Sequence, residues 1–234
     1  MRDEEIDDIL KKLASNTAGV EPELLNRISL SVGSDLQSVA AMPPSRILVG
    51  SLMLIGGLVA VSGEILLGGH GFRAMSPLEV SVILAVLGIW MWVAASQCVV
   101  EAIPGSRRIA SPLTIALSGC LVLTAIFGVL FRDYHAERFV TQGVKCFAAG
   151  IGFAIPAALG IWFVLRSGFP TNATASGFAR GMLAGLAGLT MLELHCPNLE
   201  VPHLVVWHVG VLPIGGLLGL VASLIHWKRK RLLQ

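Results

Sequence analysis

A short stretch of the chain, residues 193–208, gathers the side chains that are best suited to redox or metal chemistry. It holds one thiol, three imidazoles and two carboxylates between two segments that are almost entirely apolar. These groups belong to Glu193, His195, Cys196, Glu200, His203 and His208. Thiolates and imidazoles are ligands for soft and borderline metal ions, and a thiol can also be oxidised. We therefore expect the chemistry of this protein to lie in this stretch.

The composition of the chain is that of a membrane protein. Of its 234 residues, 54% are hydrophobic and only 14% are charged, whereas soluble domains carry charge on about a quarter of theirs. Six apolar segments approach the roughly 20 residues that cross a bilayer core. They are residues 47–69, 77–100, 110–131, 146–166, 175–194 and 204–227. The predicted fold is all-α: a polytopic membrane protein with a six-helix transmembrane bundle over residues 46–228.

The first 45 residues form a separate, short helical arm that is rich in acidic side chains. Its apolar residues recur at helical spacing, and Glu21-Pro22-Glu23 marks the start of a second helix. The residues on the apolar edges are Ile6, Ile9, Leu10, Leu13, Leu24 and Ile28. Helices this short are marginal without packing, so we expect the arm to bind a partner. Its acidity argues against direct binding of nucleic acid.

Basic residues predict the orientation of the spans. An even number of spans places the C-terminus on the same side as the N-terminus. The flanks on that side collect Arg46, Arg107, Arg108, Arg166, Arg180 and the basic residues of the tail, 228–234. The opposite flanks hold fewer: Arg73, Arg132, Arg138 and Lys145. By the positive-inside rule, both termini are predicted to be cytoplasmic.

On this topology a second thiol, Cys146, begins the fourth span at the outer face, where Cys196 also lies. The two thiols form a disulfide if their Cα atoms come within ~7 Å. Alternatively, they bind a soft metal ion, with His195, His203 and His208 as candidate further ligands. The other two cysteines, Cys98 and Cys120, fall within spans and are expected to be small apolar packing residues.

Three acidic residues, Glu64, Glu79 and Glu193, fall at the outward ends of spans. Carboxylates within a bilayer usually face a polar interior or a partner. They therefore either join the thiols and imidazoles in one pocket or reach the lipid head groups. Glu64 lies deepest and is the strongest candidate of the three for the pocket.

Several motifs in the second half of the chain together resemble those of one known family. They are Gly143-x-x-Cys146, Pro156, the small residues of 181–188, Leu194-His195-Cys196-Pro197-Asn198 and His203-x-x-x-Trp207-His208. Residues 104–108 also fit the inner loop between the second and third spans. With these features, which extend over spans two to six, the chain resembles the NrsF-type multi-pass membrane anti-sigma factors.

The resemblance implies a regulator of transcription in the bacterial inner membrane, and not an enzyme. Residues 1–45 would hold an extracytoplasmic-function sigma factor, with the apolar edges of the arm as its binding surface. Cys146 and Cys196 would be the periplasmic pair that senses an oxidant or a heavy-metal ion bound transiently. The candidate supporting ligands are His195, His203, His208, Glu64 and Glu193.

The residues also allow two other functions. A small metal or anion transporter would line its entry with Glu64, Glu79 and the histidines, although no internal repeat is visible. A membrane thiol oxidoreductase would use Cys146 and Cys196, but such enzymes usually carry a Cys-x-x-Cys pair, which the chain lacks.

Overall fold

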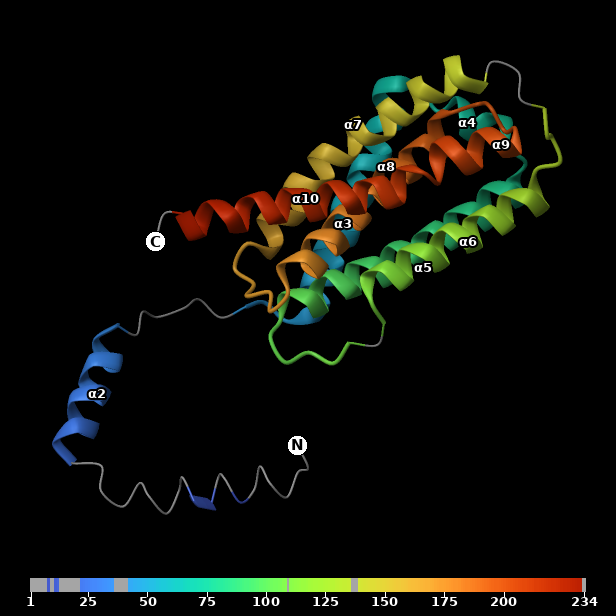
Figure 1. Ribbon diagram of the computed structural model, residues 1–234. Coiled ribbons are helices and arrows are strands. Elements are labelled where there is room, and N and C mark those ends of the chain that lie inside the picture. The colour runs from blue at the N-terminus through green and yellow to red at the C-terminus, as the bar shows by residue number, and fades with distance from the viewer. Residues whose placement is uncertain are drawn as a thin grey trace. The chain divides into compact units, whose positions relative to one another are not determined.

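The structure, a computed structural model, describes residues 8, 11–12, 22–35, 42–108, 110–135 and 139–232, and every regular element among them is helical. This agrees with the predicted all-α class. The chain divides into two units, Met1–Ala41 and Met42–Gln234, which are described separately (Figure 1).

The first unit contains helix α2, Pro22–Asp35, which begins at the proline that the sequence marks as a helix start. Three large apolar side chains along it, Leu25, Ile28 and Leu30, are 56%, 50% and 66% exposed. The remaining residues of the predicted binding edge, Ile6, Ile9, Leu10 and Leu13, lie outside the described residues, as does the side chain of Leu24. The described part of the arm is therefore a helix with an uncovered apolar edge.

The second unit is a bundle of long helices. Its elements are α3 (Ser45–Leu67), α4 (His70–Ala74), α5 (Pro77–Ala102), α6 (Pro112–Leu130), α7 (Phe139–Leu165), α8 (Ala173–His195), α9 (Val201–His203), the π-helical turn η2 (Leu204–His208) and α10 (Val211–Leu232). Ser76 and Ser111 cap α5 and α6, each followed by Pro in the first turn, as their sequence predicts. Glu79 completes the cap of α5 by accepting a hydrogen bond from the Ser76 backbone N–H at 2.6 Å.

The long helices alternate in direction, so the connecting segments gather at two ends of the bundle (Figure 1). At one end, the backbone N–H of Phe169 in the α7–α8 loop donates to the carbonyl oxygen of Ala102 at 3.0 Å. At the other end, the N–H of Val201 donates to the carbonyl oxygen of Asp133 at 2.7 Å. The second of these ends carries the candidate site.

Helix α8 is the centre of the bundle and packs against α3, α5, α7 and α10. Every residue from Ser176 to Leu194 except Arg180 is buried. Glycines let α8 and α10 approach backbone to backbone: a Cβ added to Gly181 would lie 2.8 Å from the Gly219 Cα. The small residues of these two helices therefore serve packing within one chain.

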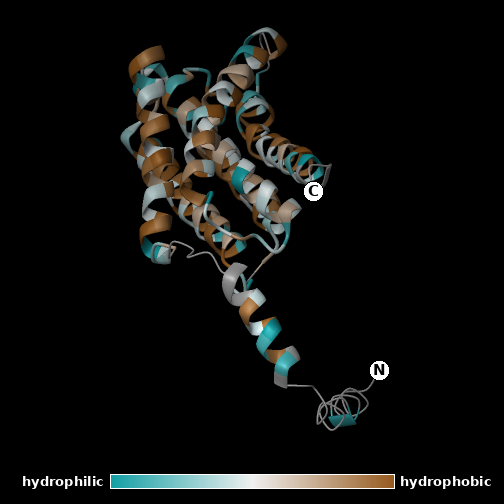
Figure 2. Cartoon of the chain, turned by 90° about the vertical axis from the view of Figure 1, so that its left-hand side faces the viewer, coloured by the Kyte–Doolittle hydropathy of each residue, from teal (hydrophilic) through white to brown (hydrophobic). Residues whose placement is uncertain are grey.

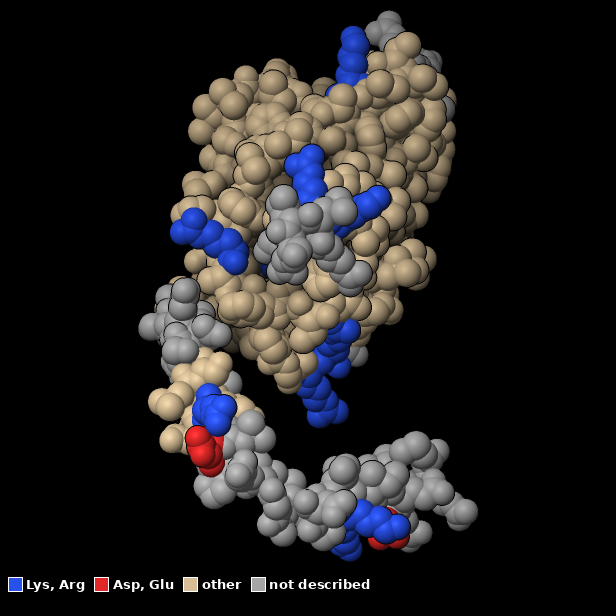
Figure 3. Space-filling model, turned by 60° about the vertical axis from the view of Figure 1, so that its left-hand side comes forward, with Lys and Arg blue, Asp and Glu red and all other residues tan. Residues whose placement is uncertain are grey.

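The helices of the bundle consist of apolar residues over much of their length (Figure 2). Five helical segments are long and apolar enough to cross a membrane: α3, α5, α6, α7 and Val201–Arg229. Helix α8, the predicted fifth span, is not among them, because Arg180, Glu193 and its many small residues make it less apolar. On the face shown in Figure 3, the charged side chains of the bundle are basic. The structure thus bears out a helical membrane protein, and the count of six spans stays a prediction.

Helix α7 begins at Phe139, whereas the fourth span is predicted to begin at Cys146. The polar residues Gln142 and Lys145 lower the hydropathy of its first two turns, although these turns are helical and pack against η2. Cys146 therefore lies about two turns inside a helix. The last segment also starts earlier than expected, at Val201, with Pro202 in its first turn.

Candidate metal and redox site

Four side chains meet at one end of the bundle: Cys146, Cys196, His203 and His208. Their sulfur and nitrogen ligand atoms all lie within 4.8 Å of one another. Cys146 comes from α7, Cys196 directly follows α8, and the histidines come from α9 and η2. The fold thus brings thiols that are 50 positions apart in sequence into one cluster with two imidazoles.

The Cys196 thiol lies at the centre of the cluster. Its Sγ is 3.5 Å from the Sγ of Cys146 and 3.5 Å from the Nε2 of His203. Cys196 is 4% exposed, both histidines are fully buried, and Cys146 is only half-buried. Cys146 is therefore the most exposed member of the cluster.

The two thiols differ in their environments. The hydrogen bond with Cys146 and, after it, burial raise the pKa of the Cys196 thiol above its ordinary value. A thiol that keeps its proton is a poor nucleophile. An oxidant is therefore expected to react first at Cys146, with Cys196 as the partner that completes a disulfide.

Glu193 supports the cluster from α8. Its Oε1 accepts a hydrogen bond from the Nδ1 of His208 at 2.7 Å, and both side chains are buried. A carboxylate on Nδ1 fixes the proton there and leaves Nε2 as the free ring nitrogen. The Nε2 of His208 is buried, and the His208 side chain also contacts the Cys146 thiol. Glu193 thus orients the imidazole within the cluster.

The π-helical turn η2 explains how His203 and His208 both reach the cluster. Residues five apart point about 140° away from each other on an α-helix. Here the backbone N–H of Val209 donates to the carbonyl oxygen of Leu204 at 3.0 Å, a hydrogen bond that closes a wider turn. The rings of His203 and His208 consequently lie 5.1 Å apart between their centroids. Short π segments are frequent at functional sites.

An aromatic cover lies between α7 and the π turn. The Trp207 ring packs 5.5 Å from Phe139 and 6.3 Å from Phe147, measured between centroids. It also lies directly against Gly143, where an added Cβ would overlap the indole. The glycine one turn before Cys146 therefore allows α7 to approach the π turn closely.

The loop after α8 is held in place by its own polar contacts. Asn198 donates from Nδ2 to the Oε1 of Gln142 at 3.1 Å, which links the loop to α7. Its Oδ1 accepts the backbone N–H of Glu200 at 2.9 Å. Gly71 of α4 lies under the loop, since an added Cβ would be 2.6 Å from the carbonyl oxygen of Cys196. These contacts fix the position of Cys196 relative to α7.

Two of the predicted site residues lie elsewhere. His195 points to the α3–α4 corner, where its Nδ1 donates to the carbonyl oxygen of Gly68 at 2.8 Å. Glu64 lies against Gly69 at the same corner. Neither belongs to the cluster, because the end of α8 turns His195 away from Cys196. Glu193, His203 and His208 do lie where the sequence predicts a site.

Sequence reasoning missed Asn198, Gln142 and the π turn. The five-residue separation of His203 and His208 is unfavourable for a shared face on an α-helix and favourable on a π turn. The polar Gln142, about one helical turn before Cys146, was a second available signal.

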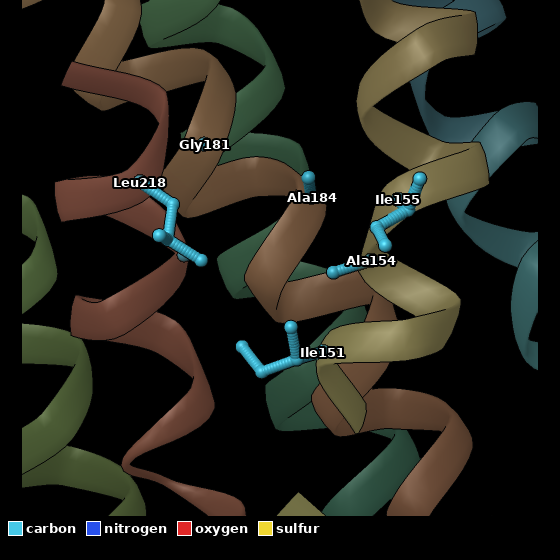
Figure 4. Close-up of a pocket in the computed structure, with 7 residues that line it drawn as sticks. Ile151, Ala154, Ile155, Gly181, Ala184 and Leu218 are labelled. Atoms are coloured by element: carbon cyan, nitrogen blue, oxygen red, sulfur yellow. The ribbon is translucent and has the colours of Figure 1, made fainter. Parts of the chain in front are cut away.

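A separate apolar cavity of about 80 Å³ lies between α7, α8 and α10 (Figure 4). It is lined by Ile151, Ala154, Ile155, Gly181, Ala184, Gly215 and Leu218. This lining carries no ionisable or nucleophilic group, so we assign it no chemistry.

Comparison with known proteins gives one consistent result. A family model described as "Negative regulator of sigma F" matches residues 33–227, which include the whole cluster. The Anti-sigma-F factor NrsF of Caulobacter vibrioides (strain NA1000 / CB15N) is 28% identical over 191 residues, covering 74% of this chain and 84% of the relative. No solved structure matches the chain. The chain therefore belongs to the NrsF family of negative regulators of sigma F.

Proposed function

We propose that this anti-sigma factor holds an extracytoplasmic-function sigma factor through its N-terminal arm and releases it when Cys146 and Cys196 react with an oxidant or a heavy-metal ion. The observation that carries the proposal is the 3.5 Å separation of the two sulfur atoms. Membership of a regulatory, non-enzymatic family speaks against the thiol oxidoreductase. The transporter loses support because Glu64 lies outside the cluster.

The redox step is the conversion of two thiols to one disulfide. With hydrogen peroxide as the oxidant, both thiols lose a proton and an electron, and the peroxide is reduced to two molecules of water. The sulfur atoms must approach from 3.5 Å to about 2.05 Å. This movement draws α7 and the loop after α8 together, which changes the packing at one end of the bundle.

The arm supplies the proposed binding surface for the sigma factor. Leu25 and Ile28 of α2 are adjacent on a helical surface and are both half exposed or more. Such an edge fits the helix-in-groove mode of recognition. The C. vibrioides relative is named as an anti-sigma-F factor, which supports a sigma factor as the partner. The family match begins at residue 33, so the role of the arm rests on its position and its exposed apolar edge.

The proposed membrane topology has six spans with both termini in the cytoplasm of a bacterial inner membrane. Helix α8 is enclosed by its neighbours, so its Arg180 and Glu193 need not contact lipid. Four basic residues lie at the end of the bundle from which the C-terminal tail emerges. They are Arg46, Arg107, Arg108 and Arg166. The positive-inside rule then assigns the Cys146 and Cys196 cluster to the periplasmic side.

Binding through the arm is tested by co-purifying the full-length protein with the extracytoplasmic-function sigma factors of the same genome. We expect one of them to be captured, and the double variant Leu25→Asp/Ile28→Asp to lose it, because two charges replace the apolar edge. Asn26→Asp is the matched control. It adds one of the two negative charges of the double variant, about 100° from Leu25 and about 160° from Ile28 on the helix. Equal capture by the double variant and the wild type would contradict the proposal.

A further inference from the structure

We propose that Cys146, Cys196, His203 and His208 form a four-ligand site for one zinc-like divalent cation, with Glu193 orienting His208. This inference deepens the sensor role proposed above, on which it rests for the site's biological purpose. It extends the site from a thiol pair to a closed set of two sulfur and two nitrogen ligands. Such a set is typical of structural zinc sites, which are four-coordinate and tetrahedral.

The distances between the ligands agree with this assignment. Zinc lies about 2.3 Å from thiolate sulfur and about 2.0 to 2.1 Å from imidazole nitrogen. The ligands of such a tetrahedron are then about 3.3 to 3.8 Å apart. The two sulfur atoms are 3.5 Å apart, and the Cys196 sulfur is 3.5 Å from the Nε2 of His203. All the ligand atoms lie within 4.8 Å of one another, so small side-chain movements complete the geometry.

The state of His208 points to a ligand at its Nε2. Metal-binding histidines commonly donate their other ring N–H to a carboxylate, and Glu193 accepts from His208 Nδ1 at 2.7 Å. The Nε2 atom is buried, and the His208 side chain also contacts the Cys146 thiol. The carboxylate on one ring nitrogen therefore leaves the other ring nitrogen available to an ion that Cys146 also binds.

The electrostatics also favour a dication. Two thiolates and one divalent cation sum to zero charge, so the four-ligand set itself carries no net charge beside the buried Glu193 carboxylate. Zinc displaces the thiol protons when it binds. The π turn supplies the remaining requirement, because it places His203 and His208 on one side at the H-x₃₋₅-H spacing of zinc sites.

The test is metal binding by the purified, reduced, full-length protein in detergent, without a sigma factor. We expect one Zn²⁺ per chain by elemental analysis. Co²⁺ should give the intense visible bands of a tetrahedral site and a thiolate-to-cobalt charge-transfer band. Cys196→Ser and His208→Ala are expected to lose both the stoichiometric ion and these bands. His195→Ala and His70→Ala are the matched controls, because they remove imidazoles from the same end of the bundle outside the cluster.

The variant Glu193→Gln covers the case in which the ligand variants fail to fold. It keeps the size of the side chain and all four ligands, so we expect tetrahedral cobalt bands with an affinity about 10 to 100 times weaker. Unchanged affinity in this variant, absence of Zn²⁺ from the reduced wild type, or equal loss in His195→Ala would overturn the site. Sigma-factor capture by the arm is a separate measurement. A negative result in metal binding and a negative result in capture would therefore refute different proposals.

Discussion

With serine in place of Cys196, sigma-dependent transcription is expected to stay at its uninduced level after oxidant or heavy metal is added. The variant protein is expected to remain in the membrane. Serine is slightly smaller than cysteine and cannot form a disulfide or supply a thiolate. Cys196 is 4% exposed and lies 3.5 Å from both Cys146 and His203, so its sulfur takes part in every chemistry available to the cluster. Its backbone N–H, which caps α8 by donating to Leu192 at 2.7 Å, is retained.

The measurement is a transcriptional reporter for the sigma factor, read before and after exposure to oxidant or heavy metal, with membrane fractions assayed for protein level. Cys120→Ser on α6 is the control, because this thiol is outside the cluster. Cys146→Ser should match Cys196→Ser, and the double variant should be no worse, since the two thiols act as a unit. A Cys196→Ser protein with a normal response would refute the sensor role.

The variant Gly181→Leu is expected to have the largest effect on stability, a loss of about 3 kcal/mol, because it overfills a closely packed contact. A side chain at Gly181 would overlap the carbonyl oxygen of Gly215 and approach the Gly219 Cα to 2.8 Å. These are backbone atoms of α10, which cannot rotate away as a side chain does. The substitution therefore forces the central helix and α10 apart.

The matched control is Gly152→Leu on α7, where an added Cβ meets nothing within 4 Å. We expect it to behave like the wild type. The two variants can be compared by heating detergent-solubilised protein and measuring the monodisperse fraction that remains. If Gly181→Leu loses its monodisperse fraction at the same temperature as the wild type, α8 and α10 do not make the close backbone contact described above.

The sequence was sufficient where local patterns determine the structure. The Ser-Pro pairs at Ser76 and Ser111 specify helix starts through a side-chain cap and a preset backbone angle, and both were correct. The proximity of Cys146 and Cys196 followed from counting spans, because adjacent ends of antiparallel helices meet on one side. Hydropathy alone placed the start of α7 too late, because Gln142 and Lys145 interrupt its apolar run.

Tertiary context decided the rest of the site. His195 is next to Cys196 in sequence and yet faces Gly68, whereas His203 and His208 reach the thiols. That selection depends on where α8 ends and on the π turn, and neither has a strong local signal. In the sequence, Glu193 was one of three carboxylates at similar depth. Only the packing of α8 against η2 shows that Glu193, and not Glu64 or Glu79, contacts the cluster.

The central position of α8 has a mechanical consequence for signalling. Its 23 residues form a continuous rod about 35 Å long, whose C-terminal end carries Glu193 and leads into Cys196. Its N-terminal end is reached through the loop containing Gly168. This loop lies against the side chain of Met42, the first described residue after helix α2. A displacement at the thiols is therefore connected to the root of the arm by a single helix and one loop.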